Sequence, residues 1–412
     1  MGKFRVKRAI AASTVMLAAV LGLGGFSTDA QQAVTGPPPG SAAWVADTAL
    51  GIHPPDPATA TPAEVAAFFA GLTPAQQGAL AVRHPLVVGN LDGAPVQLRY
   101  RANTLALTAE LGRELARATD PALTPQDHEQ ARTRAERYRA LLDGDRRILV
   151  FDPRGRGEVA EVFGEHAPTP PTPHRVPPPA THQENKDRPP GAGGVAPGFS
   201  APPAAAPRTA VVVPGSDNDL ENFDRSPGSY GTPTGMARSL YRATDRQTAV
   251  IAWTGYTTPV GIGLGAATED LARAGAARLT RLLDGLAVST RPQAPATVFC
   301  HSYGSVVCGL ARPGPDQASG VVVLGSPGMG VGSAAALDPR VPLWATARND
   351  SDWIGRVPYV SVLGLGHGAD PTAPGFGAHP LPATGAEGHA GYFAPGTASL
   401  TAFAAIALGL DR

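Results

Sequence analysis

The stretch that decides the fold is Thr297-Val298-Phe299-Cys300-His301-Ser302-Tyr303-Gly304-Ser305-Val306-Val307-Cys308. An apolar, strand-like run leads into a short turn at Ser302, and an apolar run with helical character follows it. The pattern fits G-x-S-x-G except that Cys300 takes the place of the first glycine. In that motif the serine occupies a strained strand-to-helix turn, and small residues on either side let strand and helix approach closely. Because cysteine is also small, we predict this turn here, with an ordinary serine in an ordinary turn as the alternative.

Short apolar runs on both sides of this stretch predict the strands of a sheet. Eight such runs lie at 148–151, 159–163, 209–213, 249–254, 297–300, 320–324, 343–347 and 359–363. The first two are joined by the short loop 152–157, which predicts an antiparallel hairpin. The later runs alternate with helical patterns at 236–242, 268–286 and 398–408, as parallel strands covered on both faces do. We therefore predict an α/β fold with a mostly parallel eight-stranded sheet, an antiparallel edge and helices on both faces.

Catalysis by Ser302 would need a carboxylate and a histidine, because a serine hydroxyl is a weak nucleophile near neutral pH. The acid is expected after a late strand, where Asp350 and Asp352 follow the run 343–347. The spacing does not separate these two aspartates. Either could instead cap the turn that follows the strand.

The histidine is expected in the loop between the last predicted strand, 359–363, and the terminal helix. This loop holds His367, His379 and His389, and His389 ranks first because it lies nearest that helix. A loop histidine is usually only a surface residue, so two of the three are expected to have no role. His301 adjoins Ser302 in sequence, and its side chain is expected to point away from the serine and to pack.

Two backbone N–H groups are expected to stabilise the negative charge that develops on a carbonyl attacked by Ser302. One is the N–H of Tyr303, directly after the serine. The other is expected in Pro214-Gly215-Ser216-Asp217 after the run 209–213, with Ser216 as the candidate donor and Asp217 as the second choice. The alternative is a plain acidic turn after a strand.

The ends and inserts of the chain suggest its organisation. Residues 1–30 combine four basic residues, an apolar run and small residues, which predicts a cleaved signal peptide, with a retained anchor as the alternative. Residues 41–145 read as a helical region in which Thr61, Thr73 and Thr124 each begin a helix. Residues 146–412 form the predicted α/β domain, interrupted by a Pro-rich, disordered insert at 165–208. No further stretch predicts a membrane span.

The composition excludes several classes of protein. Lys+Arg and Asp+Glu both number 34, so there is no basic surplus for binding nucleic acid. The glycine-rich segments 261–265 and 328–332 lack dinucleotide-binding spacing and are expected to be flexible loops near the mouth of the site. No metal-ligand spacing is present, and we expect neither a metal nor another cofactor. Export would place Cys300 and Cys308, the only cysteines, in an oxidising compartment, where they form a disulfide or stay as two buried thiols.

In their order along the chain, the turn at Ser302, the Val-Val-Pro-Gly-Ser loop at 212–216, the segment 322–327 and Gly388-His389 resemble the α/β-hydrolase superfamily. More narrowly, the chain resembles an actinobacterial branch of unknown function, a likeness that extends to 86–93 and 151–157. The resemblance implies Ser302, His389 and Asp352 as the catalytic residues. It does not supply a substrate.

These observations predict a secreted serine hydrolase that cleaves an ester or related acyl bond of a small or medium substrate through an acyl-enzyme. No large lid is inserted after residue 324, so the helical region or the glycine-rich loops would shape the pocket. The alternative is an inactive binding or scaffold protein of the cell envelope that keeps the fold without the chemistry.

Overall fold

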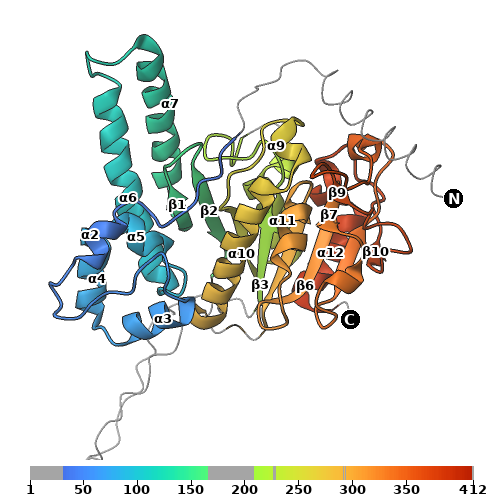
Figure 1. The fold of residues 1–412 in the computed structure, drawn as a ribbon, viewed down its shortest axis with the longest axis horizontal. Coiled ribbons are helices and arrows are strands. Elements are labelled where there is room, and N and C mark those ends of the chain that lie inside the picture. The colour runs from blue at the N-terminus through green and yellow to red at the C-terminus, as the bar shows by residue number, and fades with distance from the viewer. Residues whose placement is uncertain (1–30, 166–207, 226–228, 291, 293, 411–412) are drawn as a thin grey trace, which may run out of the picture.

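A mixed eight-stranded sheet forms the centre of the molecule (Figure 1). The computed structural model describes residues 31–165, 208–225, 229–290, 292 and 294–410. The strands of the sheet, in spatial order, are β1 (Ile148–Asp152), β2 (Glu158–Phe163), β4 (Thr248–Thr254), β3 (Arg208–Val213), β5 (Ala296–His301), β6 (Ala318–Leu324), β8 (Leu343–Thr346) and β10 (His379–Leu381). Strand β2 pairs antiparallel with β1 and β4, and the other pairs in the sheet are parallel. The predicted fold class and its antiparallel edge are confirmed.

The prediction of a last strand at 359–363 is wrong. The chain turns at the end of this segment, where Val362 and Leu365 bond to each other. Leu363, at the tip of the turn, is 98% exposed. The eighth strand is β10, which pairs in parallel with β8. Apolar pattern could not reveal β10, because it is a three-residue edge strand with two exposed positions and a proline.

Helices cover both faces of the sheet because side chains alternate along each strand. Val211 and Val213 of β3 pack on one face with α10 (Asp270–Ser289) and α11 (Gly304–Ala311). Ala210 and Val212 pack on the other face with α8 (Pro233–Ala243) and α12 (Ala398–Leu408). The central strands are buried along almost their whole length, as parallel strands between two helical layers must be.

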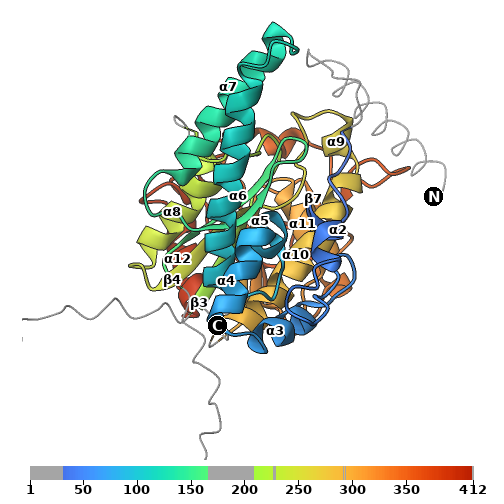
Figure 2. The ribbon, with the colours of Figure 1, turned by 90° about the vertical axis from the view of Figure 1, so that its left-hand side faces the viewer.

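The N-terminal helices lie beside the β1 edge of the sheet (Figures 1 and 2). They are α2 (Ser41–Val45), α3 (Pro62–Ala70), α4 (Pro74–Arg83), α5 (Pro85–Asn90), α6 (Val96–Arg117) and α7 (Pro125–Leu142). Capping boxes with Thr61, Thr73 and Thr124 begin α3, α4 and α7, as the sequence predicted. A small apolar core around Trp44 and Phe69 holds the first of these helices together, and Figure 2 shows α6 and α7 as a long hairpin.

Two asparagines of these helices pair with the backbone of the edge strand β1. The Asn90 amide donates to the Phe151 carbonyl (2.7 Å) and accepts from the Phe151 N–H (3.1 Å). The Asn103 amide donates to the Ile148 carbonyl (3.0 Å). Three backbone groups at the open edge of β1 are therefore satisfied by side chains.

The glycine-rich segments are more ordered than expected. Gly328–Val331 is a strand, β7, paired with β9 (His367–Gly368) in a separate two-stranded sheet. Segment 261–265 leads into the short helix α9 (Leu264–Ala267), and the Gly261 N–H donates to Asp217 (2.7 Å).

Two expectations lie outside the described residues: the signal peptide at 1–30 and the Pro-rich insert, of which only Glu165 and Arg208 are described. Within the described part of the chain, no helix is long and apolar enough to span a membrane.

Candidate active site

Ser302 lies at the tip of the turn between β5 and α11, and its backbone is left-handed, with a φ of 55°. Its N–H donates to the Leu324 carbonyl of the neighbouring strand (3.0 Å). A Cβ placed on Gly304 would lie 2.5 Å from the Val213 carbonyl oxygen, so only glycine allows α11 to approach β3 this closely. This is the strained strand-to-helix turn that the sequence predicted.

Cys300 and Cys308 form a disulfide, with their Cα atoms 6.5 Å apart. The bond ties the end of β5 to α11 across the turn that carries Ser302. The Ser305 hydroxyl donates to the Cys300 carbonyl (3.0 Å) and fastens the same turn a second time. Where the motif has its first glycine, Cys300 therefore provides a covalent link from the end of β5 to α11.

Of the three candidate histidines, His389 is the one in contact with a candidate acid. Its Nδ1 lies 2.8 Å from Asp352 Oδ1. The Asp352 side chain is fully buried, and the His389 side chain is 17% exposed. Asp350 is exposed instead. The geometry therefore separates two aspartates that spacing left as alternatives, and it favours Asp352, as the family resemblance implied.

The Asp352 carboxylate has partners on both oxygens. Oδ1 also accepts from the Ile354 N–H (2.9 Å), and Oδ2 accepts from the Tyr392 hydroxyl (2.6 Å). Burial alone would raise the pKa of Asp352, but hydrogen bonds from His389 and Tyr392 outweigh it and hold the pKa below its usual value. An ionised carboxylate only accepts, so Nδ1 of His389 carries a proton and Nε2 is the ring nitrogen that the carboxylate does not engage.

The loop with Asp352 also holds the loop with His389. The Asn349 amide donates to the Gly388 carbonyl (2.8 Å), and the Gly388 N–H donates to the Ser351 hydroxyl (2.7 Å). These bonds flank the contact between Asp352 and His389 and fix the ring in register with the carboxylate.

The His389 ring lies close to the strand end that binds Ser302. A Cβ placed on Gly325, directly after Leu324, would lie 3.0 Å from His389 Cε1. Trp353 covers the ring from another side, with centroids 4.7 Å apart. Nε2 is buried and makes no hydrogen bond to Ser302 Oγ or to any other described group. Hydrogen bonds of this kind are often long in ligand-free enzymes and shorten when substrate binds.

His301 is the site residue that sequence reasoning placed only as packing. It is buried, and its ring lies against that of His389, with centroids 4.7 Å apart. Nε2 of His301 lies 2.8 Å from the His389 carbonyl oxygen, so it donates to it. Burial, with the nearby His389, lowers the pKa of His301 to about 3, and the ring is neutral. Its place before Ser302 was the only available signal.

The other two histidines lie elsewhere. His367 is buried in β9, its Nε2 is 2.7 Å from the Ala266 carbonyl oxygen, and its ring packs against Tyr303. His379 is exposed on β10 next to Trp344.

The loop after β3 passes directly beside Ser302. A Cβ on Gly215 would lie 2.5 Å from Ser302 Cβ and 2.9 Å from both Ser302 Oγ and the Tyr303 nitrogen. The Asp217 N–H is already bonded to the Pro259 carbonyl (2.8 Å), which removes Asp217 as a donor. Among the described residues, neither the Tyr303 N–H nor the Ser216 N–H donates to a backbone carbonyl.

No group of three or more metal-ligating side chains occurs in the described ranges.

Comparison with known proteins points to the same fold. A family profile described as "Alpha/beta hydrolase" matches residues 189–362. Two uncharacterized proteins of Mycobacterium tuberculosis, MT2140 from strain CDC 1551 / Oshkosh and Rv2079 from strain ATCC 25618 / H37Rv, are each 28% identical over 372 residues. Each alignment covers 79% of this chain and 51% of the relative, so the chain spans about half the length of the curated relatives it matches.

Among solved structures, the apo form of Thermogutta terrifontis esterase 2 is 11% identical, with a TM-score of 0.29, over 61% of this chain and 88% of that chain. The propionate-bound form of that esterase matches with 10% identity, the same TM-score and the same coverage. With TM-scores this low, these likenesses say nothing about the substrate of this chain.

The sheet order, with its single antiparallel strand and the strained serine turn after β5, defines an α/β protein of the hydrolase type. Taken with the profile that matches residues 189–362, this arrangement is that of the α/β-hydrolase fold.

Proposed function

We propose that this chain is a serine hydrolase that cleaves an ester or related acyl bond through Ser302, His389 and Asp352. The observation that carries the proposal is the 2.8 Å contact between His389 Nδ1 and Asp352 Oδ1, made beside the strained turn of Ser302. This contact leaves Nε2 as the basic nitrogen, and Ser302 is its proposed proton donor.

In the proposed reaction, Ser302 Oγ attacks the carbonyl carbon while His389 Nε2 takes the hydroxyl proton. Asp352 stabilises the imidazolium ion that forms. The carbonyl oxygen becomes an oxyanion, stabilised by the N–H groups of Tyr303 and Ser216. The imidazolium then gives its proton to the leaving alcohol, and an acyl-serine remains. Water, deprotonated by the same nitrogen, then attacks the acyl carbon. The bond from this carbon to Ser302 Oγ breaks, the imidazolium returns the proton to Oγ, and the acid leaves.

The direct test is covalent labelling of the purified chain with a fluorophosphonate probe, with the modified residue mapped by mass spectrometry. We expect labelling at Ser302, none in Ser302→Ala, and strongly slowed labelling in His389→Ala. Asp352→Asn should slow labelling, whereas the matched control Asp350→Asn should label at the wild-type rate. A folded chain that stays unlabelled would instead favour an inactive binding or scaffold protein.

The oxyanion donors can be tested with substrate turnover. Ser216→Pro removes the backbone N–H, whereas Ser216→Ala keeps it. Loss of one such donor typically costs about 10²- to 10³-fold in kcat. We expect a fall of this size in Ser216→Pro on a p-nitrophenyl ester and near wild-type turnover in Ser216→Ala. Equal turnover in both variants would remove Ser216 from the proposed role.

Export is the second part of the proposal. The disulfide between Cys300 and Cys308 supports it, because such bonds persist in oxidising compartments and are rare in the cytosol. Expression of the full chain in an actinobacterial host, followed by N-terminal sequencing of the protein recovered from the medium, tests it. A mature chain that begins near residue 31 is expected, and an uncleaved chain retained in the cells would contradict it.

A further inference from the structure

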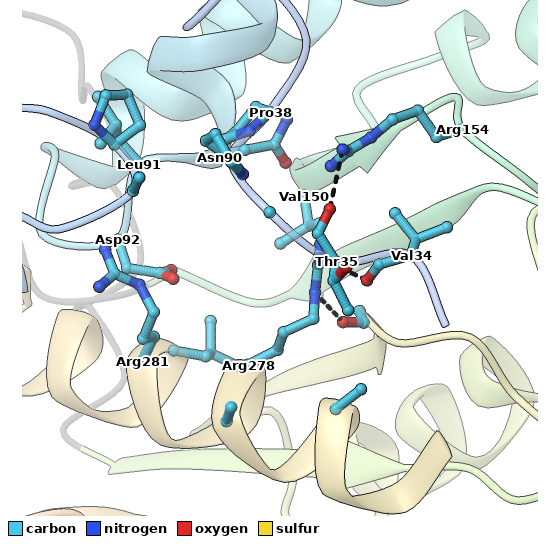
Figure 3. A pocket seen from close by; sticks show the side chains of 18 of the residues that line it. Val34, Thr35, Pro38, Asn90, Leu91, Asp92, Val150, Arg154, Arg278 and Arg281 are labelled. Atoms are coloured by element: carbon cyan, nitrogen blue, oxygen red, sulfur yellow. Dashed lines mark hydrogen bonds between the residues drawn. The ribbon is translucent and has the colours of Figure 1, made fainter. Parts of the chain in front are cut away.

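A cavity of about 310 Å³ lies between the N-terminal helices and the α/β domain, outside the site described above (Figure 3). Its walls come from the segment 34–38, the end of α5 with the two residues after it (90–92), the β1–β2 hairpin and one face of α10. Two sequence segments that the proposed reaction does not use, 86–93 and 151–157, contribute Asn90, Asp92 and Arg154 to it.

Four arginines line this cavity, and three of them already have a carboxylate partner. Arg99 pairs with Asp92 (2.9 Å), and Arg154 pairs with Asp152 (2.6 Å). Arg278 pairs with Glu158.

The fourth arginine, Arg281, forms no ion pair with any described residue. Its guanidinium donates to the Ala60 carbonyl (3.1 Å), which leaves other N–H groups of its fork for a ligand. Figure 3 shows Arg281 and Arg278 on the same wall of the cavity, as residues three apart on a helix must be.

The cavity therefore carries one positive charge beyond its paired groups. A single unpaired positive charge balances the charge of a monoanion but not that of a dianion. The rest of the lining includes apolar side chains such as Leu91, Val150 and Leu282, which suit a short hydrocarbon body.

We propose that this cavity binds a small carboxylic acid as its monoanion, with the carboxylate on Arg281 and the hydrocarbon body against the apolar wall. A guanidinium fork matches a carboxylate in two parallel hydrogen bonds. The volume lies at the lower end of the range for small-molecule sites, roughly 300–1,000 Å³. The site is independent of Ser302 and stands whether or not the chain is a hydrolase.

The test is isothermal titration calorimetry of the full chain with sodium hexanoate, carried out in the Ser302→Ala background so that no turnover interferes. Burial raises the pKa of Glu158 to about 7 against the opposing effect of Arg278, so pH 8 keeps the pair of Glu158 and Arg278 charged. Inorganic phosphate, a dianion at this pH, and hexylammonium, a cation of similar length, are the comparison ligands. We expect one hexanoate per chain and weaker binding of both others.

Two variants locate the binding. Arg281→Gln should weaken hexanoate binding at least tenfold, and Ala277→Leu should do the same by filling the cavity without changing its charge. The matched control is Arg273→Gln, which changes an exposed arginine on the same helix and should bind hexanoate as the wild type does.

Absence of hexanoate binding, tighter binding of phosphate, or equal binding in Ala277→Leu and wild type would each overturn the proposal. Ala277 is an exposed position of α10, so Ala277→Leu removes no core contact and the variant is expected to fold as the wild type does.

Discussion

At the residue scale, the backbone strain at Ser302 can be separated from its chemistry. A residue other than glycine in the left-handed region costs about 1–2 kcal/mol. Ser302→Ala keeps this cost, whereas Ser302→Gly removes most of it. We predict that Ser302→Gly has a free energy of unfolding about 1 kcal/mol higher than Ser302→Ala, measured by urea denaturation. Equal stabilities would show that the turn is not strained.

His301 gives a second prediction, on pH. A histidine with its pKa lowered to about 3 in the folded chain stays neutral there, while in the unfolded chain it takes up a proton below pH 6.5. Its contribution to stability is therefore full above pH 6.5 and is lost as the pH falls from 6.5 toward 3. At pH 5 the loss amounts to about 2 kcal/mol.

His301→Gln should lack this loss, because the amide can still donate to the His389 carbonyl but does not titrate. The check is the free energy of unfolding of both proteins at pH 7 and pH 5. The wild type should lose about 2 kcal/mol more than the variant between the two values. His367, whose pKa burial also lowers, is present in both proteins and cancels. The same pH dependence in both proteins would contradict the assignment.

Only some residues of the candidate site could be predicted from the sequence. Ser302 was predictable because its turn is made by neighbours in sequence. Spacing alone did not separate Asp352 from Asp350, because which carboxylate is buried depends on Tyr392 and His389, about 40 residues away. Only the family resemblance favoured Asp352. The sequence allows Asp352 either to cap the turn or to contact the histidine, and Asp352 does both: Oδ1 accepts from the Ile354 N–H and from His389. The contact of His301 with His389 exists only in the folded chain.

At the scale of elements, the disulfide between Cys300 and Cys308 covalently links β5 to α11. Closing a loop this short is worth about 2–3 kcal/mol by the loss of chain entropy in the unfolded state. We predict that the double variant Cys300→Ala, Cys308→Ala unfolds at lower urea concentration, with a free energy of unfolding lower by that amount. In excess dithiothreitol the difference from wild type should vanish. A difference that survives reduction would assign the effect to packing of the sulfur atoms.

The strands show where sequence pattern succeeds and fails for whole elements. The first seven strands of the main sheet were visible as apolar runs because most are buried on both faces. Segment 359–363 has the same composition but lies in a turn, and β10 has almost no apolar signal. The spacing of apolar residues reflects which positions are buried. An edge strand of three residues with two exposed positions has too few buried positions to give a recognisable pattern.

At the scale of the whole molecule, the N-terminal helices and the sheet depend on each other. A chain cut to residues 146–412 would lose Asn90 and Asn103 and expose the edge of β1. It would also lose Leu107, Tyr138 and Leu141 of α6 and α7, which belong to the same apolar core as Ile148 and Phe151 of β1. We predict that this fragment aggregates, measured by light scattering during refolding, whereas the chain from residue 31 refolds as a monodisperse species. A soluble fragment with native circular dichroism would contradict this.

The pairing of Asn90 and Asn103 with β1 also bears on how copies of this protein behave toward one another when concentrated. A sheet with an open edge invites another chain to add its own strand and grow a polymer. Here that edge is closed by two amide side chains that mimic a neighbouring strand but offer nothing further to pair with. The asparagines thus block the addition of a further strand at β1. A second copy of the protein that approaches this side meets helices and not an open strand edge.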